Sequence, residues 1–390
     1  QGHHVVGSVA LAHTRLAIID LETGDQPLFA GPAALVGNGE IYNNPELRAA
    51  NAFSCATGSD CEPPLHLWRQ EGIRFADGLR GMWALAIHDR AARRVVLSRD
   101  PFGIKPLYIA EVAGGIAFAS EPQALVAAGL VAPKVRAESR DELMQLQFTT
   151  GQETIFEGIR RVLPGETLAI SDGAVVERHR QAALPEGGPE ETGEAEAIAR
   201  FGRAFAEAVE FHQRADVPYG MFLSGGTDSA AVLHAMSRLN ERPVLAFTAG
   251  FDTGDKDERE QAAAVARAAG ARHVRLEVSE VEVWRHLPEI VGAMDDPAAD
   301  YAIVPTWFLA RRAREEVKVV LSGEGGDEIL AGYGRHRSAM RPWWLGGKAM
   351  RAHGTFDRLD VLRAPPRLWR DGFEAAETAA ATPGRTRLMA

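Results

Sequence analysis

The sequence predicts a mixed α/β protein of two domains, the first rich in β-strands and the second built on a parallel sheet. Three observations lead to this prediction. Short apolar segments separated by Gly, Pro and Asp/Asn turns recur over about the first 180 residues. A Pro-, Gly- and Glu-rich stretch at 184–195 then lacks periodicity and is typical of a linker. Beyond it, strand-like and helix-like segments alternate, which favours a parallel sheet covered on both faces.

Composition and charge exclude several classes of protein. The 390 residues are 46% hydrophobic and 25% charged, which is typical of a globular protein and not of a disordered or fibrous one. The net charge of −10 argues against a nucleic-acid partner, and no apolar run reaches the ~20 residues of a membrane helix. Two cysteines, Cys55 and Cys61, are too few for a disulfide framework or a thiolate zinc site. We expect a cytoplasmic enzyme with no nucleic-acid or membrane partner.

The first part is predicted to hold short strands interrupted by one helix. The helix is expected from about Cys61 to Glu71, because Ser59 and Asp60 are good N-cap residues directly before it. The expected strands are 9–12, 16–19, 33–36, 82–87, 94–97, 107–109 and 116–119.

The second part is predicted to alternate strands with helices. The expected strands are 219–223, 244–248, 273–278 and 317–321, and the expected helices are 228–239, 258–269 and 306–316. Ligands of such sheets bind beyond the carboxyl ends of the strands, so the site is expected there.

The strongest local signal is Ser-Gly-Gly-Thr-Asp-Ser at Ser224–Ser229, the first glycine loop, which follows an apolar strand and opens a helix. Its two glycines let backbone N–H groups converge on an anion at the helix N-terminus. Asp228 is placed to hold a metal ion that bridges phosphates. No Gly-Lys-Ser/Thr follows as in a Walker A loop, and taken alone the segment could be an ordinary glycine turn.

A second glycine-rich segment follows another apolar strand. The second glycine loop, Ser322–Glu328, reads Ser-Gly-Glu-Gly-Gly-Asp-Glu and carries three carboxylates directly after the strand. Because the strand ends of a parallel sheet converge, both loops are expected to contribute to one Mg–nucleotide site. Asp228 and Asp327 are the candidate metal ligands.

The first glycine loop resembles the pyrophosphate loop of the family that adenylates carboxylates or ureido oxygens with ATP. Ser322–Tyr333 is similar to the matching block of glutamine-hydrolysing asparagine synthetases. The resemblance implies an adenine nucleotide alpha hydrolase-like (PP-loop) domain that uses ATP and Mg²⁺. It implies that Glu324 contacts the acyl-adenylate and takes a proton from the attacking ammonia. The ATP-binding residues that it implies are Leu223, Ser224, Gly225, Gly226, Asp228, Ser229, Ala249, Glu258, Ser322 and Gly323.

The first part resembles class II glutamine amidotransferase domains, which implies an N-terminal-nucleophile (Ntn) hydrolase-type αββα sandwich. The segments that carry the resemblance occur in family order; among them are His13–Asp20, Gly37–Asn43, Gly58–Glu62, Ser98–Tyr108 and Phe118–Leu125.

The chemistry of a glutamine site can be assigned within these segments. Arg15 can hold the α-carboxylate bidentately, and Asp60 can hold the α-ammonium. The Asn38 side chain and the Gly39 N–H can stabilise the tetrahedral oxyanion, and Glu40 completes the substrate cage.

The sequence departs from the family at both ends. The family nucleophile is a cysteine at the mature N-terminus, whereas this sequence begins with Gln1, and Cys55 and Cys61 lie in the wrong motifs to replace it. The family's lysine-bearing C-terminal section is not found either. We expect the sequence to be part of a longer chain; a shortened, inactive relative is the alternative.

The prediction as a whole is a glutaminase domain at 1–183, a linker at 184–195 and an asparagine synthetase domain at 196–390. Glutamine, ATP and aspartate are the expected substrates, with asparagine, AMP, pyrophosphate and glutamate as products. The open alternatives are amidation of a different carboxylate, ring closure as in β-lactam synthetases, and a non-catalytic relative. Retention of the glutamine-binding residues speaks against ring closure. A homodimer is one expected assembly, which the sequence does not decide.

Overall fold

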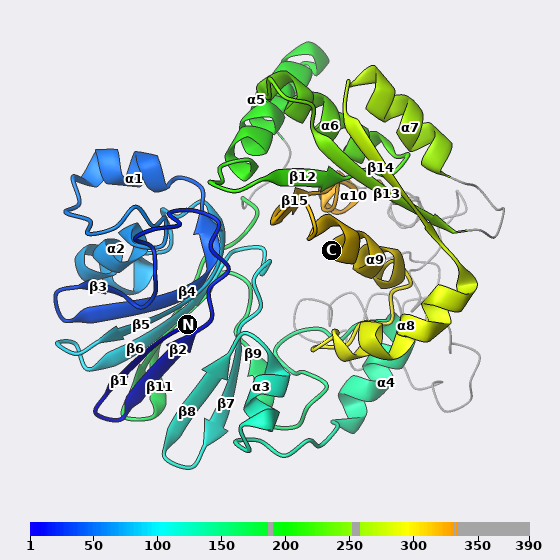
Figure 1. Ribbon diagram of the computed structural model, residues 1–390. Coiled ribbons are helices and arrows are strands. Elements are labelled where there is room, and N and C mark those ends of the chain that lie inside the picture. Colours follow the sequence, from blue (N-terminus) through cyan, green and yellow to red (C-terminus); the bar gives the residue numbers. More distant parts are fainter. Residues whose placement is uncertain (186–189, 252–257, 331, 334–390) are drawn as a thin grey trace. The chain divides into compact units, whose positions relative to one another are not determined.

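The computed structural model describes residues 1–185, 190–251, 258–330 and 332–333 (Figure 1). The chain forms two compact units, each described here by itself. The first unit contains Gln1–Pro133, Gly158–Tyr219 and Glu316–Val319, and the second contains Lys134–Glu157, Gly220–Glu315 and the chain from Val320. Residues 186–189 of the expected linker lie outside the described residues. The expected domain boundaries stay a prediction, because units assembled from several chain segments do not mark a boundary in the sequence.

The first unit contains two antiparallel sheets and a hairpin. The larger sheet has the strand order β11-β10-β6-β5-β4-β3, and the smaller has the order β8-β7-β9. The hairpin pairs β1 (Gly2–Val6) with β2 (Val9–His13). The sheet strands are β3 (Leu28–Ala30), β4 (Ala33–Ile41), β5 (Gly81–Asp89), β6 (Arg94–Arg99), β7 (Tyr108–Val112), β8 (Gly115–Ala119), β9 (Ile159–Arg161), β10 (Glu166–Ser171) and β11 (Ala174–Arg180).

Alternation along the central strands separates two apolar cores. On β5, Leu85 and Ile87 face a core shared with α2 (Pro63–Glu71) and with Phe75, which directly follows the 3₁₀ turn η1 (Gly72–Arg74). Ala84 and Ala86 of the same strand face a core shared with the smaller sheet, as expected for side chains of period two. Helix α3 (Pro122–Ala127) packs against β8. This order of layers, helix, sheet, sheet and helix, confirms the predicted αββα sandwich. The unit also contains α1 (Asn44–Asn51) and α5 (Glu194–His212).

The second unit is built on a four-stranded sheet of order β14-β13-β12-β15. The pairs β12/β13 and β13/β14 are parallel, as predicted. Helices α7 and α9 both pack on β13, and Figure 1 shows them on opposite faces of the sheet. The strands are β12 (Tyr219–Phe222), β13 (Leu245–Phe251), β14 (Arg272–Val278) and β15 (Val319–Leu321). The helices are α4 (Ala137–Leu146), α6 (Thr227–Leu239), α7 (Glu258–Ala268), α8 (Glu280–Gly292), α9 (Ile303–Ala313) and α10 (Gly326–Ile329).

Three local expectations are wrong. Residues 16–19 form no strand, because the Arg15 guanidinium binds the carbonyls of Ile19 and Asp20 in place of a neighbouring strand. Helix α2 begins at Pro63 with Glu62 as N-cap, so Ser59 and Asp60 do not cap it. Proline at the first helical position has no N–H to satisfy, which lessens the need for a side-chain cap. The part of the chain before 184 also has the short helices α1, α3 and α4 in addition to the one expected.

Candidate active sites

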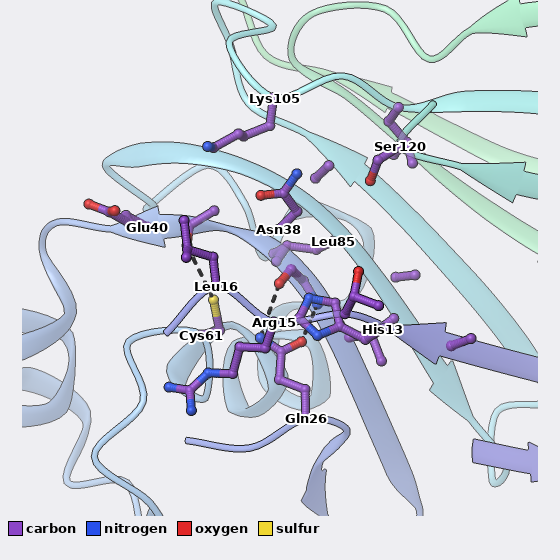
Figure 2. Close-up of a pocket in the computed structure, with 18 of the residues that line it drawn as sticks. His13, Arg15, Leu16, Gln26, Asn38, Glu40, Cys61, Leu85, Lys105 and Ser120 are labelled. Carbon is purple, nitrogen blue, oxygen red and sulfur yellow. Dashed lines mark hydrogen bonds between the residues drawn. The ribbon is translucent and has the colours of Figure 1, made fainter. Parts of the chain in front are cut away.

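The first unit contains a pocket of about 560 Å³ that brings together all five residues predicted to bind glutamine. Asn38, Gly39 and Glu40 come from β4, Arg15 from the loop after β2, and Asp60 from the segment before α2. Figure 2 shows the Arg15 guanidinium on the opposite side of the pocket from Asn38 and Lys105. Residues far apart in the sequence therefore line one cavity, although their individual roles stay a prediction.

Strand β4 runs so close to β5 that only glycine fits at position 39. A Cβ atom on Gly39 would lie 2.3 Å from the Met82 carbonyl oxygen and 2.7 Å from the Trp83 Cα. This close approach fixes the backbone N–H that we assign to the oxyanion. Within the described residues the Asn38 amide has no hydrogen-bond partner, so its N–H groups are available to a ligand.

The Gln26 side chain holds β4 beside Asn38. Its amide nitrogen donates to the Gly37 carbonyl over 3.0 Å, and its amide oxygen accepts from the Gly37 N–H over 2.6 Å. Sequence reasoning missed Gln26, because a glutamine before a proline carries no chemical signature of its own. Only the position of Gln26 between His13–Asp20 and Gly37–Asn43, two segments that resemble the amidotransferase family, could have indicated it.

Arg15 is held at the edge of the pocket. Its Nη2 donates to the carbonyl oxygens of Ile19 (2.7 Å) and Asp20 (2.6 Å), and its Nη1 donates to Asp25 over 3.3 Å. Its side chain is only 13% exposed. A guanidinium has five N–H donors, so two of them remain for an anion that enters the pocket.

Two buried carboxyl groups line the pocket. Glu40 and Asp60 are each 5% exposed, and Asp60 Oδ2 accepts from the Ile41 N–H over 2.7 Å. Burial raises the pKa of Asp60 to about 6. Burial and then repulsion from Asp60 raise the pKa of Glu40 to about 7, while Lys105 acts in the opposite direction. An ammonium group of a ligand beside these carboxyls would favour their ionised forms.

Lys105 was not predicted to line the pocket, although it lies in Ser98–Tyr108, one of the segments that resemble the amidotransferase family. Its position is set by Asp100, which is fully buried and accepts backbone N–H groups from Phe102, Ile104 and Lys105. Lys105 lines the pocket and interacts electrostatically with Glu40. It is the cation that limits the rise in the pKa of Glu40.

The free energy of unfolding is expected to depend on pH because the pKa of the Glu40 carboxyl group differs between the folded and unfolded chain. Its pKa lies near 4.5 when exposed and at about 7 in the folded chain, where Asp60 and Lys105 face it. Between these values the unfolded state has already lost the proton that the folded state keeps, so the free energy of unfolding falls as pH rises. Over the full window the loss is about 3 kcal/mol. Thermal unfolding from pH 4 to 7.5 measures it, and Glu40→Gln is expected to flatten the profile between pH 6 and 7, above the raised pKa of Asp60. A wild-type profile that rises between pH 6 and 7 would contradict the assignment.

In the second unit the two glycine loops pack against one another. A Cβ atom on Gly323 would lie 2.8 Å from the Ser229 backbone nitrogen, and one on Gly326 would lie 2.4 Å from Asp228 Oδ2. Glycine at both positions therefore permits the second glycine loop to touch the first at Asp228. The predicted juxtaposition of the two loops is present within the described residues.

The first glycine loop is organised by its own hydroxyl groups. Ser224 Oγ and Ser229 Oγ lie 2.9 Å apart, and Ser224 Oγ accepts from the Gly226 N–H over 3.1 Å. Helix α6 begins at Thr227, within this segment, so the positive end of the helix dipole lies at the two glycines. Gly225 packs on Gln261 of α7, a neighbour that sequence reasoning missed because nothing in its own segment signals a loop contact. Hydroxyls, a helix N-terminus and a nearby carboxylate suit a metal-bound phosphate.

The other predicted nucleotide residues are distributed around these loops. Leu223 is buried after β12, and its carbonyl accepts from Thr248 Oγ1 over 2.6 Å. The Glu324 N–H donates to Ser322 Oγ over 3.4 Å, and both residues are exposed. Ala249 lies in β13, Glu258 is the first residue of α7, and Asp327 lies in α10. Joint metal binding by Asp228 and Asp327 stays a prediction.

Comparison with known proteins identifies the two halves of the chain. Residues 1–180 match the family model of the glutamine amidotransferase domain, and residues 200–387 match that of asparagine synthase. A Mycobacterium tuberculosis protein provisionally named asparagine synthetase [glutamine-hydrolyzing] is 40% identical over 358 residues, which cover 86% of this chain and 54% of the relative. A Methanocaldococcus jannaschii protein provisionally named asparagine synthetase [glutamine-hydrolyzing] 2 is 30% identical to this chain. The match covers 86% of this chain and 68% of that relative.

The chain therefore belongs to the family of glutamine-hydrolysing asparagine synthetases. It spans about half the length of the M. tuberculosis relative. A Penicillium rubens protein named Amidase chyE is also similar, at 29% identity over 87% of this chain and 53% of its own length. None of the helices within the described residues is long and apolar enough to cross a membrane.

Proposed function

We propose that glutamine is hydrolysed in the 560 Å³ pocket and that its ammonia is used to amidate aspartate. The observation that supports this most strongly is the joint presence in one pocket of Arg15, Asp60 and the Asn38–Gly39 segment. A guanidinium, a buried carboxylate and aligned N–H donors match the three polar ends of a glutamine molecule.

Each group has a separate part in the first reaction. Arg15 binds the α-carboxylate and Asp60 binds the α-ammonium, so the side-chain amide of glutamine is directed at Asn38 and Gly39. When a nucleophile adds to the amide carbon, the carbonyl oxygen becomes an oxyanion that these two residues stabilise. Collapse of the adduct releases ammonia, and hydrolysis of the acyl-enzyme then releases glutamate.

Neither cysteine of the chain suits the role of nucleophile. Cys61 lines the pocket, but burial and the two carboxylates raise the pKa of its thiol well above the ordinary value. The pKa of Cys55 is also raised by burial. A thiol that stays protonated is a poor nucleophile. The resemblance assigns this role to an N-terminal cysteine, which the sequence given does not include.

The second reaction is assigned to the two glycine loops. The first glycine loop binds the phosphates of ATP, and bound Mg²⁺ would neutralise their charge, with Asp228 and Asp327 as its ligands. The aspartate side-chain carboxylate attacks the α-phosphorus, which forms an acyl-adenylate and releases pyrophosphate. Ammonia then attacks the acyl carbon, Glu324 accepts its proton, and the amide and AMP leave.

The acceptor is the part of this proposal with an open alternative. The similarity to a protein named as an amidase fits a family with more than one substrate class, so another carboxylate is the second candidate. A pyrophosphate-release assay on the complete gene product distinguishes them, with Mg·ATP, glutamine and a panel of carboxylic acids. Release that depends on aspartate supports the proposal. Release that depends only on another acid would assign the alternative, and no release with any acid would contradict adenylation.

A further inference from the structure

A cysteine, a glutamate and a histidine meet in the first unit outside the glutamine pocket. One ligand atom each from Cys55, Glu62 and His66 lies within 4.8 Å of the other two. None of the three lines the pocket. Two cysteines are too few for a zinc site made of thiolates alone. A mixed site with one sulfur, one oxygen and one nitrogen ligand needs only one of them.

The local fold brings these ligands together for clear reasons. Glu62 is the N-cap residue of α2 and His66 lies one turn further on, so the two side chains share a helix face. The Glu62 carboxylate accepts the backbone N–H groups of Ala56 (2.6 Å) and Thr57 (2.8 Å). These bonds fix the loop that carries Cys55 directly over the start of the helix.

One nitrogen of the histidine makes no hydrogen bond. His66 Nε2 is buried and has no hydrogen-bond partner among the residues that the structure describes, although the side chain as a whole is 15% exposed. Glu62 Oε1 is 3.6 Å away, which is too long for a good hydrogen bond. Two ligands of a tetrahedral zinc ion, each bound at about 2.0 Å, lie about 3.3 Å apart. The separation therefore fits a shared cation better than a direct contact.

The surroundings restrict and polarise this cluster. The Phe53 ring stacks on His66 with centroids 5.1 Å apart and an interplanar angle of 19°, which limits rotation of the imidazole. Arg48 donates to the carbonyls of Thr57 (3.1 Å) and Ser59 (2.6 Å), on the same loop as Cys55. The Arg48 guanidinium also interacts electrostatically with the Cys55 sulfur.

We propose that Cys55, Glu62 and His66 form a binding site for a thiophilic divalent cation, Zn²⁺ in particular. A thiolate and an imidazole select zinc over Mg²⁺ or Ca²⁺, which take oxygen ligands. The negative charges of the thiolate and the carboxylate balance those of the cation. Three protein ligands leave a fourth position open to solvent or a small anion. The cation would connect both ends of segment 55–66, which carries Asp60 into the glutamine pocket.

Cobalt titration tests this site without any assay of enzymatic activity. Co²⁺ bound to a thiolate shows a sulfur-to-metal charge-transfer band. The purified chain is expected to show that band, which saturates at one bound Co²⁺ per chain. Added Zn²⁺ is expected to remove it by competition. Cys55→Ser is expected to abolish the band, and His66→Gln to weaken Zn²⁺ binding at least tenfold, because even changes beyond the ligands cost about 10–100-fold.

Cys61→Ala is the matched control, since it removes the other cysteine and leaves the three ligands in place. It is expected to keep the band, and thermal unfolding of each variant checks that it is folded. Absence of the band in the wild-type chain at saturating Co²⁺ would overturn the proposal. So would a band that survives Cys55→Ser, or one that is lost in a folded Cys61→Ala variant.

Discussion

Arg15→Ala is expected to lower kcat/KM for glutamine by about 100-fold or more while synthesis with free ammonium continues. Two charge-assisted hydrogen bonds to the α-carboxylate would be lost, each worth about 1.5–3 kcal/mol. The measurement compares amide formation from glutamine with amide formation from ammonium in the same preparation of the complete gene product. The ratio of the two rates isolates the glutamine pocket from the second reaction.

A structural role for Arg15 needs a separate control, because its guanidinium also holds the carbonyls of Ile19 and Asp20. Arg15→Lys keeps a positive charge without the planar pair of donors, so glutamine use is expected to stay low. Arg74→Ala, an exposed residue paired with Asp77, is expected to leave both rates unchanged. Unchanged glutamine use in Arg15→Ala would show that the pocket is assigned wrongly.

Asp228→Asn is expected to reduce ATP-dependent pyrophosphate release at least 100-fold while glutaminase activity is kept. The change removes a negative ligand from the proposed Mg²⁺ site at almost constant shape, and loss of about 3 kcal/mol corresponds to this factor. Because Gly326 comes so close to Asp228 Oδ2, a larger residue at 228 would disturb the second glycine loop as well. Asparagine avoids that effect.

Glu260→Gln serves as the matched control for Asp228→Asn. Glu260 is exposed on α7 and pairs with Arg275, so its loss is expected to leave pyrophosphate release unchanged. Raising the Mg²⁺ concentration is expected to restore part of the activity of Asp228→Asn. Full pyrophosphate release by Asp228→Asn at ordinary Mg²⁺ would remove Asp228 from the metal site.

Periodicity and turn residues predicted most of the fold. A short apolar stretch between turn residues predicted the strand that the structure shows as β5, and the glycine loops marked the carboxyl ends of β12 and β15. The strand expected at 16–19 failed because side-chain hydrogen bonds from Arg15, which no periodicity records, replace backbone pairing. Local sequence patterns depend on the spacing of residues along the chain. They contain no information on contacts between residues that are far apart in the sequence.

Residues of the pocket were predicted only where the residue type itself suggests a chemical role. Asp60 illustrates the limit, because a helix cap and a buried carboxyl group that lines a pocket have the same local sequence. The fold decides between them by directing Asp60 to the Ile41 N–H. Gln26 and Lys105 were missed because their roles arise from the three-dimensional neighbours Gly37 and Glu40.

The central claim is that nitrogen from glutamine ends in the amide of an acceptor activated by ATP. Its most direct test uses glutamine labelled with ¹⁵N in the side-chain amide, together with Mg·ATP, aspartate and the complete gene product. The predicted result is asparagine with ¹⁵N in its amide, formed in equal amount with AMP and pyrophosphate. Hydrolysis of glutamine that yields labelled ammonia only, with ATP unchanged and no labelled amide from any carboxylic acid supplied, would contradict the claim.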